Sequence, residues 1–442
     1  MVLLHIGIDD TDSLTGGCTT YIGARLVYRL ERETKAKFID YPNLIRLNPN
    51  IPYKTRGNGA ICLRINIDKS MIEEVETIVI EEVEENADLK CEETHPGIVF
   101  FIGNIPFELK KFAEKAVTNV IMLNEALKIV NKIGAKIKTY KKGRGIIGAL
   151  AAIGNTLEKD HTYELLSYRS PEYWRTPRTI DKDSVYLMDK LTKPETFNNI
   201  DKETKRILIT PHGPDPVLYG IRGENPEIVK LASKIVVSYE PIERWVIYRT
   251  NQGTDEHLTK LRKIKEIKPY QPAKTLVKIV EPPKIIPGGH VIVKATDNTA
   301  TIDLAAYEPT GNFRKIIQKL IPEDTIIAYG GVKPQENKPL TLNLEKIEIL
   351  NLAPKIIYKN PKCPKCGKRM KSAGKNQGYR CKKCKTHAKN IEKEKIQIPR
   401  EIKPGIYLPT LRAHRHLTKP LQRYGKEKKN KPKKLIEKWH YP

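Results

Sequence analysis

Three carboxylates crowd the segment that follows the first strand-like run of the chain. Asp9, Asp10 and Asp12 fall directly after the apolar run Val2 to Gly7. Side chains at this spacing can bring at least two oxygen ligands to one hard divalent cation. Mg²⁺ carrying a nucleotide triphosphate is the natural ligand of such a loop, and we predict that Asp9 and Asp12 bind it.

The same loop ends in Thr15 to Thr20, where a helix-like pattern opens. Backbone N–H groups at a helix N-terminus favour an anion, and threonine hydroxyls add further donors. We therefore expect Thr11, Cys18 and Thr20 to contribute to a phosphate site around Thr19. An ordinary polar turn with an N-cap threonine would explain either half of this segment alone. The adjacency of carboxylates and phosphate donors modestly favours the nucleotide site.

A second candidate phosphate site is the glycine-rich stretch Lys141 to Gly154. Glycines let the backbone approach a ligand closely, and the cations at its start suit phosphate, so we expect binding by Lys142, Gly143, Arg144 and Gly145. A tightly packed helix of small residues is the alternative for Ala149 to Gly154. The basic segment Tyr53 to Gly59 is equally compatible with phosphate or RNA binding and with a solvated hairpin.

Four of the seven cysteines form two closely spaced pairs, Cys363 with Cys366 and Cys381 with Cys384. Each pair fits one tight knuckle, and both pairs together complete a tetrahedral thiolate site. We predict a structural Zn²⁺, because four cysteine ligands leave no open coordination position. Disulfides are the alternative, and a cytoplasmic chain disfavours them.

Basic charge is concentrated at the C-terminal end of the chain. Residues 353–442 hold 28 Lys and Arg against 5 Glu, which is +23 of the total net charge of +27. Such a field attracts a polyanion, so nucleic acid is the leading partner. The charged surface of a thermostable protein is the alternative explanation. Such a surface carries similar numbers of lysines and glutamates, which the excess of lysine here does not match. No apolar run is long enough to cross a bilayer, and no leader pattern opens the chain, so we expect no membrane contact and a cytoplasmic protein.

The elements around these motifs alternate between strand-like and helix-like patterns, which predicts a multidomain α/β (α+β) protein. We expect strands at 2–7, 60–67, 98–102, 207–210 and 246–249, and helical patterns at 20–35, 71–86 and 106–133. A proline-rich texture around Lys268 marks a boundary. The strand, helix and strand patterns after it fit a small OB-type barrel, a common platform for single-stranded nucleic acid.

These patterns divide the chain into four predicted units. They are a nucleotide-binding half, an OB-fold RNA-binding domain, a zinc ribbon and a basic tail, at residues 1–267, 268–353, 354–400 and 401–442. In the tail, His416, Tyr424 and Trp439 are interspersed with basic residues, a composition that suits RNA phosphates and bases. A disordered solubilising tail is the alternative.

The motifs, in their order along the chain, resemble those of the archaeal isoleucine-tRNA 2-agmatinylcytidine synthetases. The resemblance covers essentially the whole chain, including the OB-like segment and the four cysteines. It rests on GIDDTDSLTGGCTTY at 7–21, RGNGA at 56–60, KGRGIIGALAAIG at 142–154, SYRSPEYWRTPRTID at 167–181 and PHGPDPVLYGIRG at 211–223. The resemblance also implies a kinase-like domain entwined with a ferredoxin-like domain in the N-terminal half.

The activity that the resemblance implies is a ligation on the wobble cytidine of an isoleucine tRNA with a CAU anticodon, which then decodes AUA. ATP phosphorylates the cytosine 2-carbonyl oxygen, and the primary amine of agmatine displaces phosphate. By the same resemblance, Asp9, Asp10 and Asp12 match the metal- and phosphate-binding acids, and Thr19 matches a threonine that becomes phosphorylated.

Agmatine carries a guanidinium, which favours carboxylates and carbonyl oxygens, so we expect Asp215, Tyr219 and Gly220 to bind it. Two other functions remain open on the residues alone. A non-catalytic RNA-binding protein would explain the charge but not the acidic loop. A kinase of small molecules would explain the loop but not the basic tail.

Overall fold

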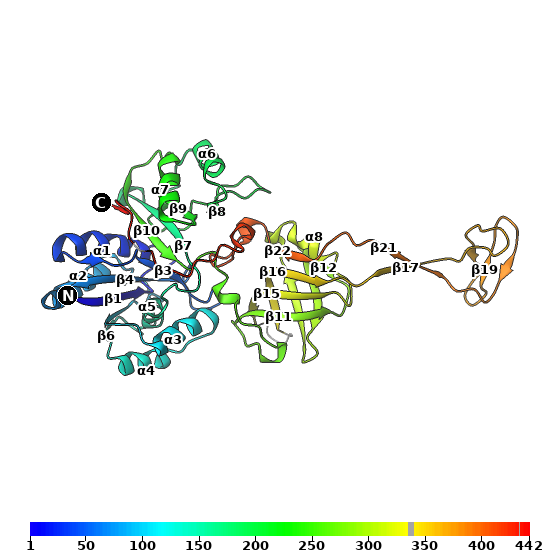
Figure 1. Ribbon diagram of the computed structural model, residues 1–442, viewed down its shortest axis with the longest axis horizontal. Coiled ribbons are helices and arrows are strands. Elements are labelled where there is room, and N and C mark those ends of the chain that lie inside the picture. The colour runs from blue at the N-terminus through cyan, green and yellow to red at the C-terminus, as the bar shows by residue number, and fades with distance from the viewer. Residues whose placement is uncertain (335–339, 433) are drawn as a thin grey trace.

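The computed structural model describes residues 1–334, 340–432 and 434–442, arranged as three bodies in a row (Figure 1). A large α/β body holds both chain termini, a barrel follows it, and a small ribbon lies at the far end of a two-stranded arm. Among the described residues, no helix has the length and apolar character that crossing a bilayer requires.

One 11-stranded sheet runs through the α/β body. Its strands are β1 (Val2–Asp9), β2 (Lys37–Phe38), β3 (Asn43–Arg46), β4 (Gly59–Ile67), β5 (Gly97–Ile102), β6 (Lys136–Thr139), β7 (Thr162–Arg169), β8 (Thr196–Phe197), β9 (Val217–Gly223), β10 (Ile242–Thr250) and β23 (His440–Tyr441). Their order is β6-β5-β1-β4-β3-β10-β7-β9-β8, with β2 paired to β4 and β23 to β10. The β3–β10 pairing is parallel and short, and it joins the two halves of the sheet.

Helices cover both faces of this sheet because their apolar stripes need a partner surface. They are α1 (Thr19–Thr34), α2 (Ile72–Asn86), α3 (Phe107–Thr118), α4 (Leu123–Ile133), α5 (Gly145–Gly154), α6 (Lys182–Thr192) and α7 (Pro226–Ile235). Helix α1 packs on α2 and β4, whereas α5 packs on β1 and β5. A Cβ at Gly7 would lie 2.2 Å from the Ala149 carbonyl oxygen, so β1 and α5 touch through their backbones.

Two sequence predictions in this body need correction. The helical pattern over 106–133 forms two helices, because the backbone becomes extended at Asn119, directly after α3. The predicted strand over 207–210 is wrong, since only an isolated bridge joins Ile207 to Ile200. The run is short and leads into a segment with three prolines, which cannot donate to a ladder, so the sheet instead takes β9 further along.

The barrel is closed by five strands, with a sixth and a seventh added to the same sheet. The five are β11 (Pro272–Ile279), β13 (His290–Thr296), β14 (Thr301–Ala306), β15 (Thr325–Lys333) and β16 (Thr341–Asn351), and the additions are β12 (Lys284–Ile286) and β22 (Gly405–Tyr407). A short helix, α8 (Phe313–Ile317), packs on β13 and β14. The prediction of an OB-type barrel after the α/β half is confirmed.

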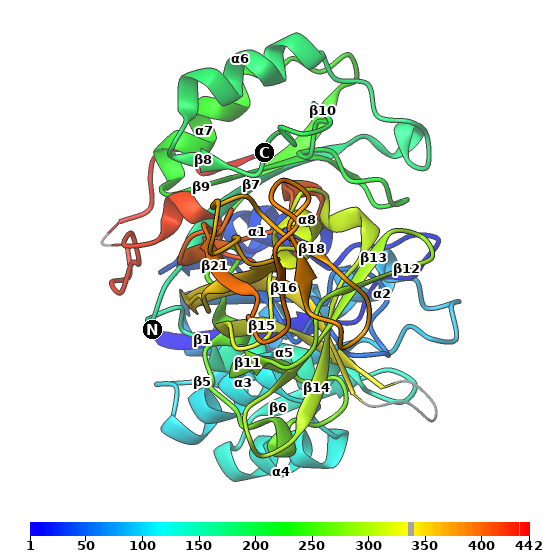
Figure 2. The same cartoon turned by 90° about the vertical axis from the view of Figure 1, so that its right-hand side faces the viewer.

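A pair of strands, β17 (Lys355–Lys359) and β21 (Glu394–Ile398), forms the arm that leads to the ribbon. The ribbon itself holds β18 (Lys371–Ser372), β19 (Tyr379–Arg380) and β20 (His387–Ala388). Figure 2, which faces the ribbon end, shows the arm in front of the barrel. The ribbon has a very small apolar core, as expected where a metal holds the fold together.

Residues 405–442, here called the C-terminal strap, return from the arm to the α/β body. The strap pairs with the barrel through β22, and β23 adds to β10. Trp439 is buried between Phe38 and Tyr41. The described part of the strap is therefore not a free tail, and Trp439 packs in the core instead of facing an RNA base.

Candidate active site

A cavity of about 550 Å³ opens at the short join between β3 and β10. Both halves of the sheet contribute to its walls, and the C-terminal strap adds one residue, His416. The acidic loop, the basic loop before β4, the start of α5 and strands β7 and β9 supply most of the polar lining. Segments that are far apart in sequence therefore meet here because the sheet brings its two halves together.

Asp9, Asp10 and Asp12 all line this cavity. Arg144 Nε lies 3.1 Å from Asp10 Oδ2, and Arg56 Nε lies 2.7 Å from Asp12 Oδ2. Asp9 has no ion-pair partner in the described part of the chain, and its carboxylate packs over Gly148. Burial and then the charge of Asp10 raise the pKa of Asp9 well above its usual range.

A half-buried carboxylate without an ion-pair partner, beside two others, fits a divalent cation, which would relieve the cost of its desolvation. The three acids do not converge on one point, however. Within the described residues, the four ribbon cysteines are the one group of three or more ligand side chains whose donor atoms lie within 4.8 Å of one another. A cation held by Asp9 and Asp12 would therefore need further oxygen ligands, from a bound molecule or from water.

The phosphate-binding segment lies where α1 begins. Thr11 Oγ1 and Thr19 Oγ1 are 2.9 Å apart, and both side chains are buried. The N-cap of α1 is Cys18, whose side chain makes no capping hydrogen bond. The alternative of a threonine N-cap is therefore wrong, and the side chain at the N-cap leaves the first amides of α1 to other acceptors.

The glycine-rich stretch contributes less than expected. Arg144 lines the cavity, whereas Lys142 is exposed outside it. Gly143 adopts a φ of +65° in the turn before α5, and the Gly145 N–H donates to the His95 carbonyl at 2.9 Å. Both glycines thus shape the backbone without lining the cavity, and the alternative of a packed small-residue helix describes α5.

Of the candidate agmatine residues, Asp215 and Gly220 line the cavity. Asp215 is already paired, since its carboxylate lies 3.5 Å from Arg56 and 3.4 Å from Arg178. Tyr219 is buried on the other side of β9, with its hydroxyl 3.5 Å from the Ser233 carbonyl, and is not among the lining residues. The alternation of side chains along a strand explains why Tyr219 and Gly220 face opposite ways.

Several lining residues escaped the sequence analysis. One wall is apolar and includes Leu47, Ile51, Ala116, Val120, Ile121 and Ile147, a surface suited to a flat heterocycle. A polar corner is formed by Arg46, Glu164 and Arg222, each of which stands in an otherwise strand-like run. A charged residue inside an apolar strand is the signal that could have identified these three.

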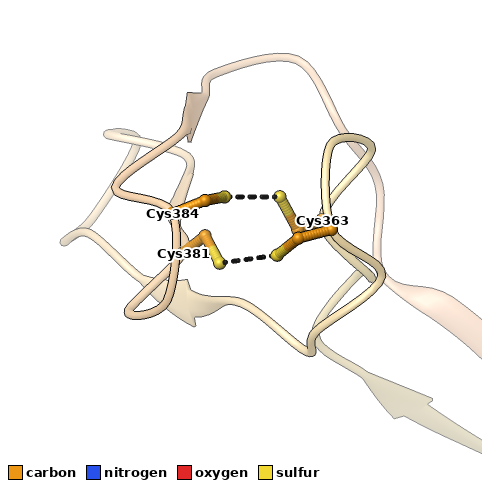
Figure 3. Close-up of side chains that lie close together, drawn as sticks. Cys363, Cys381 and Cys384 are labelled. Carbon is orange, nitrogen blue, oxygen red and sulfur yellow. Dashed lines mark hydrogen bonds between the residues drawn. The ribbon is translucent and has the colours of Figure 1, made fainter.

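The four cysteines of the ribbon lie close together, and Figure 3 shows Cys363, Cys381 and Cys384 directed toward one another. Cys363 Sγ is 3.4 Å from Cys384 Sγ, and Cys366 Sγ is 3.5 Å from Cys381 Sγ. A tetrahedral site with Zn–S bonds of about 2.3 Å separates its sulfurs by about 3.8 Å. The donor set and its spacing therefore fit a structural Zn²⁺.

Comparisons with protein families match three parts of the chain. The TiaS TCKD domain matches residues 5–142, the TiaS FLD domain residues 143–257, and the TiaS C-terminal zinc ribbon domain residues 360–402.

Curated relatives are similar over almost the whole chain. The isoleucine-tRNA 2-agmatinylcytidine synthetase TiaS of Thermococcus sibiricus is 46% identical, covering 95% of this chain and 96% of the relative. The protein of the same name from Methanocaldococcus jannaschii is 44% identical, covering 96% and 99%.

Solved structures agree with these relatives. A complex of TiaS with its isoleucine tRNA and ATP aligns with a TM-score of 0.87 at 42% identity, covering 96% of this chain and 98% of that chain. A complex of TiaS with the same tRNA, AMPCPP and agmatine aligns with a TM-score of 0.84 at 39% identity and the same coverage.

Proposed function

The chain belongs to the TiaS family of isoleucine-tRNA 2-agmatinylcytidine synthetases, and we propose that the cavity of about 550 Å³ is its active site. The protein is an ATP-dependent ligase that joins agmatine to the wobble cytidine of this isoleucine tRNA. We assign the active site to this cavity because the acidic loop, the N-terminus of α1 and an apolar wall all line it.

The reaction needs a phosphoryl transfer and a displacement. The cytosine 2-carbonyl oxygen takes a phosphoryl group from ATP, and the primary amine of agmatine then attacks carbon 2. The C2–O bond breaks, phosphate leaves, and the amine loses a proton. Phosphorylation is required because a carbonyl oxygen by itself is a very poor leaving group.

Thr19 is the residue we assign to phosphoryl transfer. Its hydroxyl lies at the first turn of α1, where backbone amides stabilise an incoming phosphate, and Thr11 Oγ1 orients it from 2.9 Å. Asp9 and Asp12 would hold Mg²⁺, which neutralises charge on the transferring phosphoryl group. The pairing of Asp12 with Arg56 keeps this carboxylate in the cavity.

The guanidinium of agmatine needs an anionic partner, and Asp215 with the backbone at Gly220 is our candidate. Agmatine would have to compete with Arg56 and Arg178 for Asp215, since both arginines already lie within 3.5 Å of it. A positive ligand can replace a positive side chain at little electrostatic cost if the freed arginine then binds phosphate.

We propose that the tRNA binds to the basic surface of the ribbon and arm, which lies far from the α/β body (Figure 1). The wobble base must leave its stack to reach the cavity. Contacts to the RNA backbone at a distance from the cavity can hold the rest of the tRNA in position while it does so. We place this activity in the cytoplasm, where a tRNA substrate is present.

The test is incorporation of labelled agmatine into an unmodified transcript of the isoleucine tRNA, with and without ATP, by wild type, Thr19→Ala and Thr77→Ala. Thr77 is an exposed threonine on α2 and serves as the matched control. We expect ATP-dependent labelling that falls by a factor of about 100 or more in Thr19→Ala and is unchanged in the control. Tight tRNA binding without labelling by wild type would instead indicate a non-catalytic RNA-binding protein.

A further inference from the structure

Three side chains from distant parts of the chain form a positively charged corner of the cavity. Arg46 ends β3, Arg222 lies in β9, and His416 lies in the C-terminal strap. The corner lies in the same cavity as the phosphate-binding segment, since Arg46, Cys18 and Asp12 all line it. Neither the acidic loop nor the agmatine candidates account for these three residues.

Arg46 is held in place but not neutralised. Its backbone N–H donates to Asn251 Oδ1 at 2.8 Å, and its carbonyl accepts from Asn251 Nδ2 at 2.9 Å. Its Nε is buried without a hydrogen-bond partner, and no carboxylate within the described ranges forms an ion pair with its guanidinium. Burial lowers the pKa of Arg46 to about 10, so the side chain stays positive at neutral pH. A half-buried cation without an ion-pair partner is costly unless a ligand compensates it.

Two contacts of His416 Nδ1 bear on which of its nitrogens carries the proton. Arg222 Nη2 lies 2.9 Å from His416 Nδ1, and Gln252 Oε1 lies 3.1 Å from the same nitrogen. The two contacts need opposite roles of Nδ1, because a guanidinium only donates and an amide oxygen only accepts. We assign Nδ1 as the acceptor of the shorter contact, from Arg222, which leaves the hydrogen on Nε2 and makes the Gln252 contact a close approach of two acceptors. The positive charge of Arg46, followed by burial, holds the pKa of His416 well below its usual range, which keeps the ring neutral.

The N–H at Nε2 is directed toward the loop at Gly57. A Cβ built on Gly57 would lie 3.3 Å from Nε2 and 2.5 Å from Arg46 Nη1, so a side chain there would displace both groups. Arg46 Nη1 donates a long hydrogen bond of 3.4 Å to the Gly57 carbonyl. Glu164 accepts from Arg222 Nε at 2.9 Å and fixes its guanidinium beside His416. Two fixed cations and the imidazole thus converge beside one carboxylate, Glu164, so the corner keeps a net positive charge.

We propose that Arg46, Arg222 and His416 form an anion subsite that binds a phosphate group during the reaction. The proposal deepens the proposed function and rests on it. Phosphate has several oxygens that accept from guanidinium and imidazole N–H groups, which suits this set of donors. It can be supplied by the nucleotide or by the phosphorylated cytosine, and the test below separates these sources.

The strap brings His416 into the cavity. The Gly253 N–H donates to the His416 carbonyl at 2.9 Å, and the Asp255 N–H donates to the Leu417 carbonyl at 2.8 Å. Arg415, the preceding residue, lies 3.8 Å from Glu345 of the barrel. The subsite is therefore incomplete until the strap has docked between the barrel and the α/β body.

The test compares full-length wild type with Arg46→Gln, His416→Phe and His416→Gln. Arg412→Gln is the control, because it removes an exposed cation of the same strap outside the cavity. Binding of the ATP analogue AMPCPP is measured by calorimetry, and agmatine incorporation is measured against ATP concentration. Thermal unfolding and tRNA binding of each variant show that it is folded.

If the subsite binds the nucleotide, Arg46→Gln and His416→Phe weaken AMPCPP binding by about tenfold or more. If it binds the phosphorylated cytosine, AMPCPP binding is retained while kcat falls by a similar factor at unchanged KM for ATP. In either case His416→Gln, which keeps a donor near the position of Nε2, recovers most of the loss, and Arg412→Gln retains AMPCPP binding. Folded Arg46→Gln and His416→Phe proteins that match wild type within twofold in both assays would overturn the subsite. Absence of labelling by wild type would instead contradict the proposed function.

Discussion

Two neighbouring glycines in the phosphate-binding segment should respond very differently to the same small substitution. Gly17 has a φ of +71°, and a Cβ built on it would lie 2.7 Å from the Thr11 carbonyl oxygen. A Cβ on Gly16 meets nothing closer than 3.5 Å, where the nearest atom belongs to the flexible Arg175 side chain. The substitution Gly17→Ala should therefore deform the loop, whereas Gly16→Ala should be tolerated.

The size of the effect follows from two losses. An alanine in the left-handed region costs roughly 1 to 2 kcal/mol. Moving the chain at Gly17 also breaks the bond from Arg56 Nη2 to the Gly17 carbonyl, which is 2.6 Å long, and a bond to a charged donor contributes about 1.5 to 3 kcal/mol. Together these losses amount to roughly 3 kcal/mol, or on the order of a hundredfold in rate if each turnover needs the native loop.

The assay is the initial rate of ATP-dependent agmatine incorporation for wild type and both variants, with urea unfolding as the measure of global stability. We expect Gly17→Ala to lose activity far more than Gly16→Ala, with a smaller loss of global stability because the loop can yield locally. Equal activities of the two variants, within about threefold, would refute the argument from φ and steric contact.

Two other predictions concern the ribbon and the core. Cys381→Ser removes one thiolate from the site, so we expect a lower zinc content by atomic absorption. We also expect weaker tRNA binding with unchanged affinity for AMPCPP. Full zinc content in this variant would contradict a four-cysteine site. Burial and the charge of Arg64 lower the pKa of His5 to about 3, so the unfolded chain takes up a proton near pH 6.5 while the folded protein does not. Stability contributed by neutral His5 is thus present above about pH 6.5 and is lost as the pH falls, and wild type should lose about 2 kcal/mol more than His5→Gln between pH 7 and pH 5 in urea titrations. Parallel pH profiles of the two proteins would show that His5 is not the cause.

The spacing of residues in the sequence was sufficient to predict sites whose chemistry depends only on sequence neighbours. Two Cys-x2-Cys pairs predict a tetrahedral thiolate site because each pair forms its own knuckle, whatever the rest of the chain does. The apolar periodicities of β1, α1 and α2 likewise predict their burial, since each must hide one face. The family and its reaction came from the order of whole motifs, which no single spacing could supply.

Other residues of the cavity could not be found in this way. Four residues of the cavity lie far apart in the sequence: Arg46, Glu164, Arg222 and His416. They come together only because β3 pairs with β10 and the strap returns to the α/β body. Strand register also turned Tyr219 into the core and left Gly220 at the cavity. The sequence by itself determined which local ligand sets can form, because short-range geometry is set by neighbouring residues. Only the tertiary structure decided which distant charges share one cavity, because that depends on pairings between segments that local patterns do not encode.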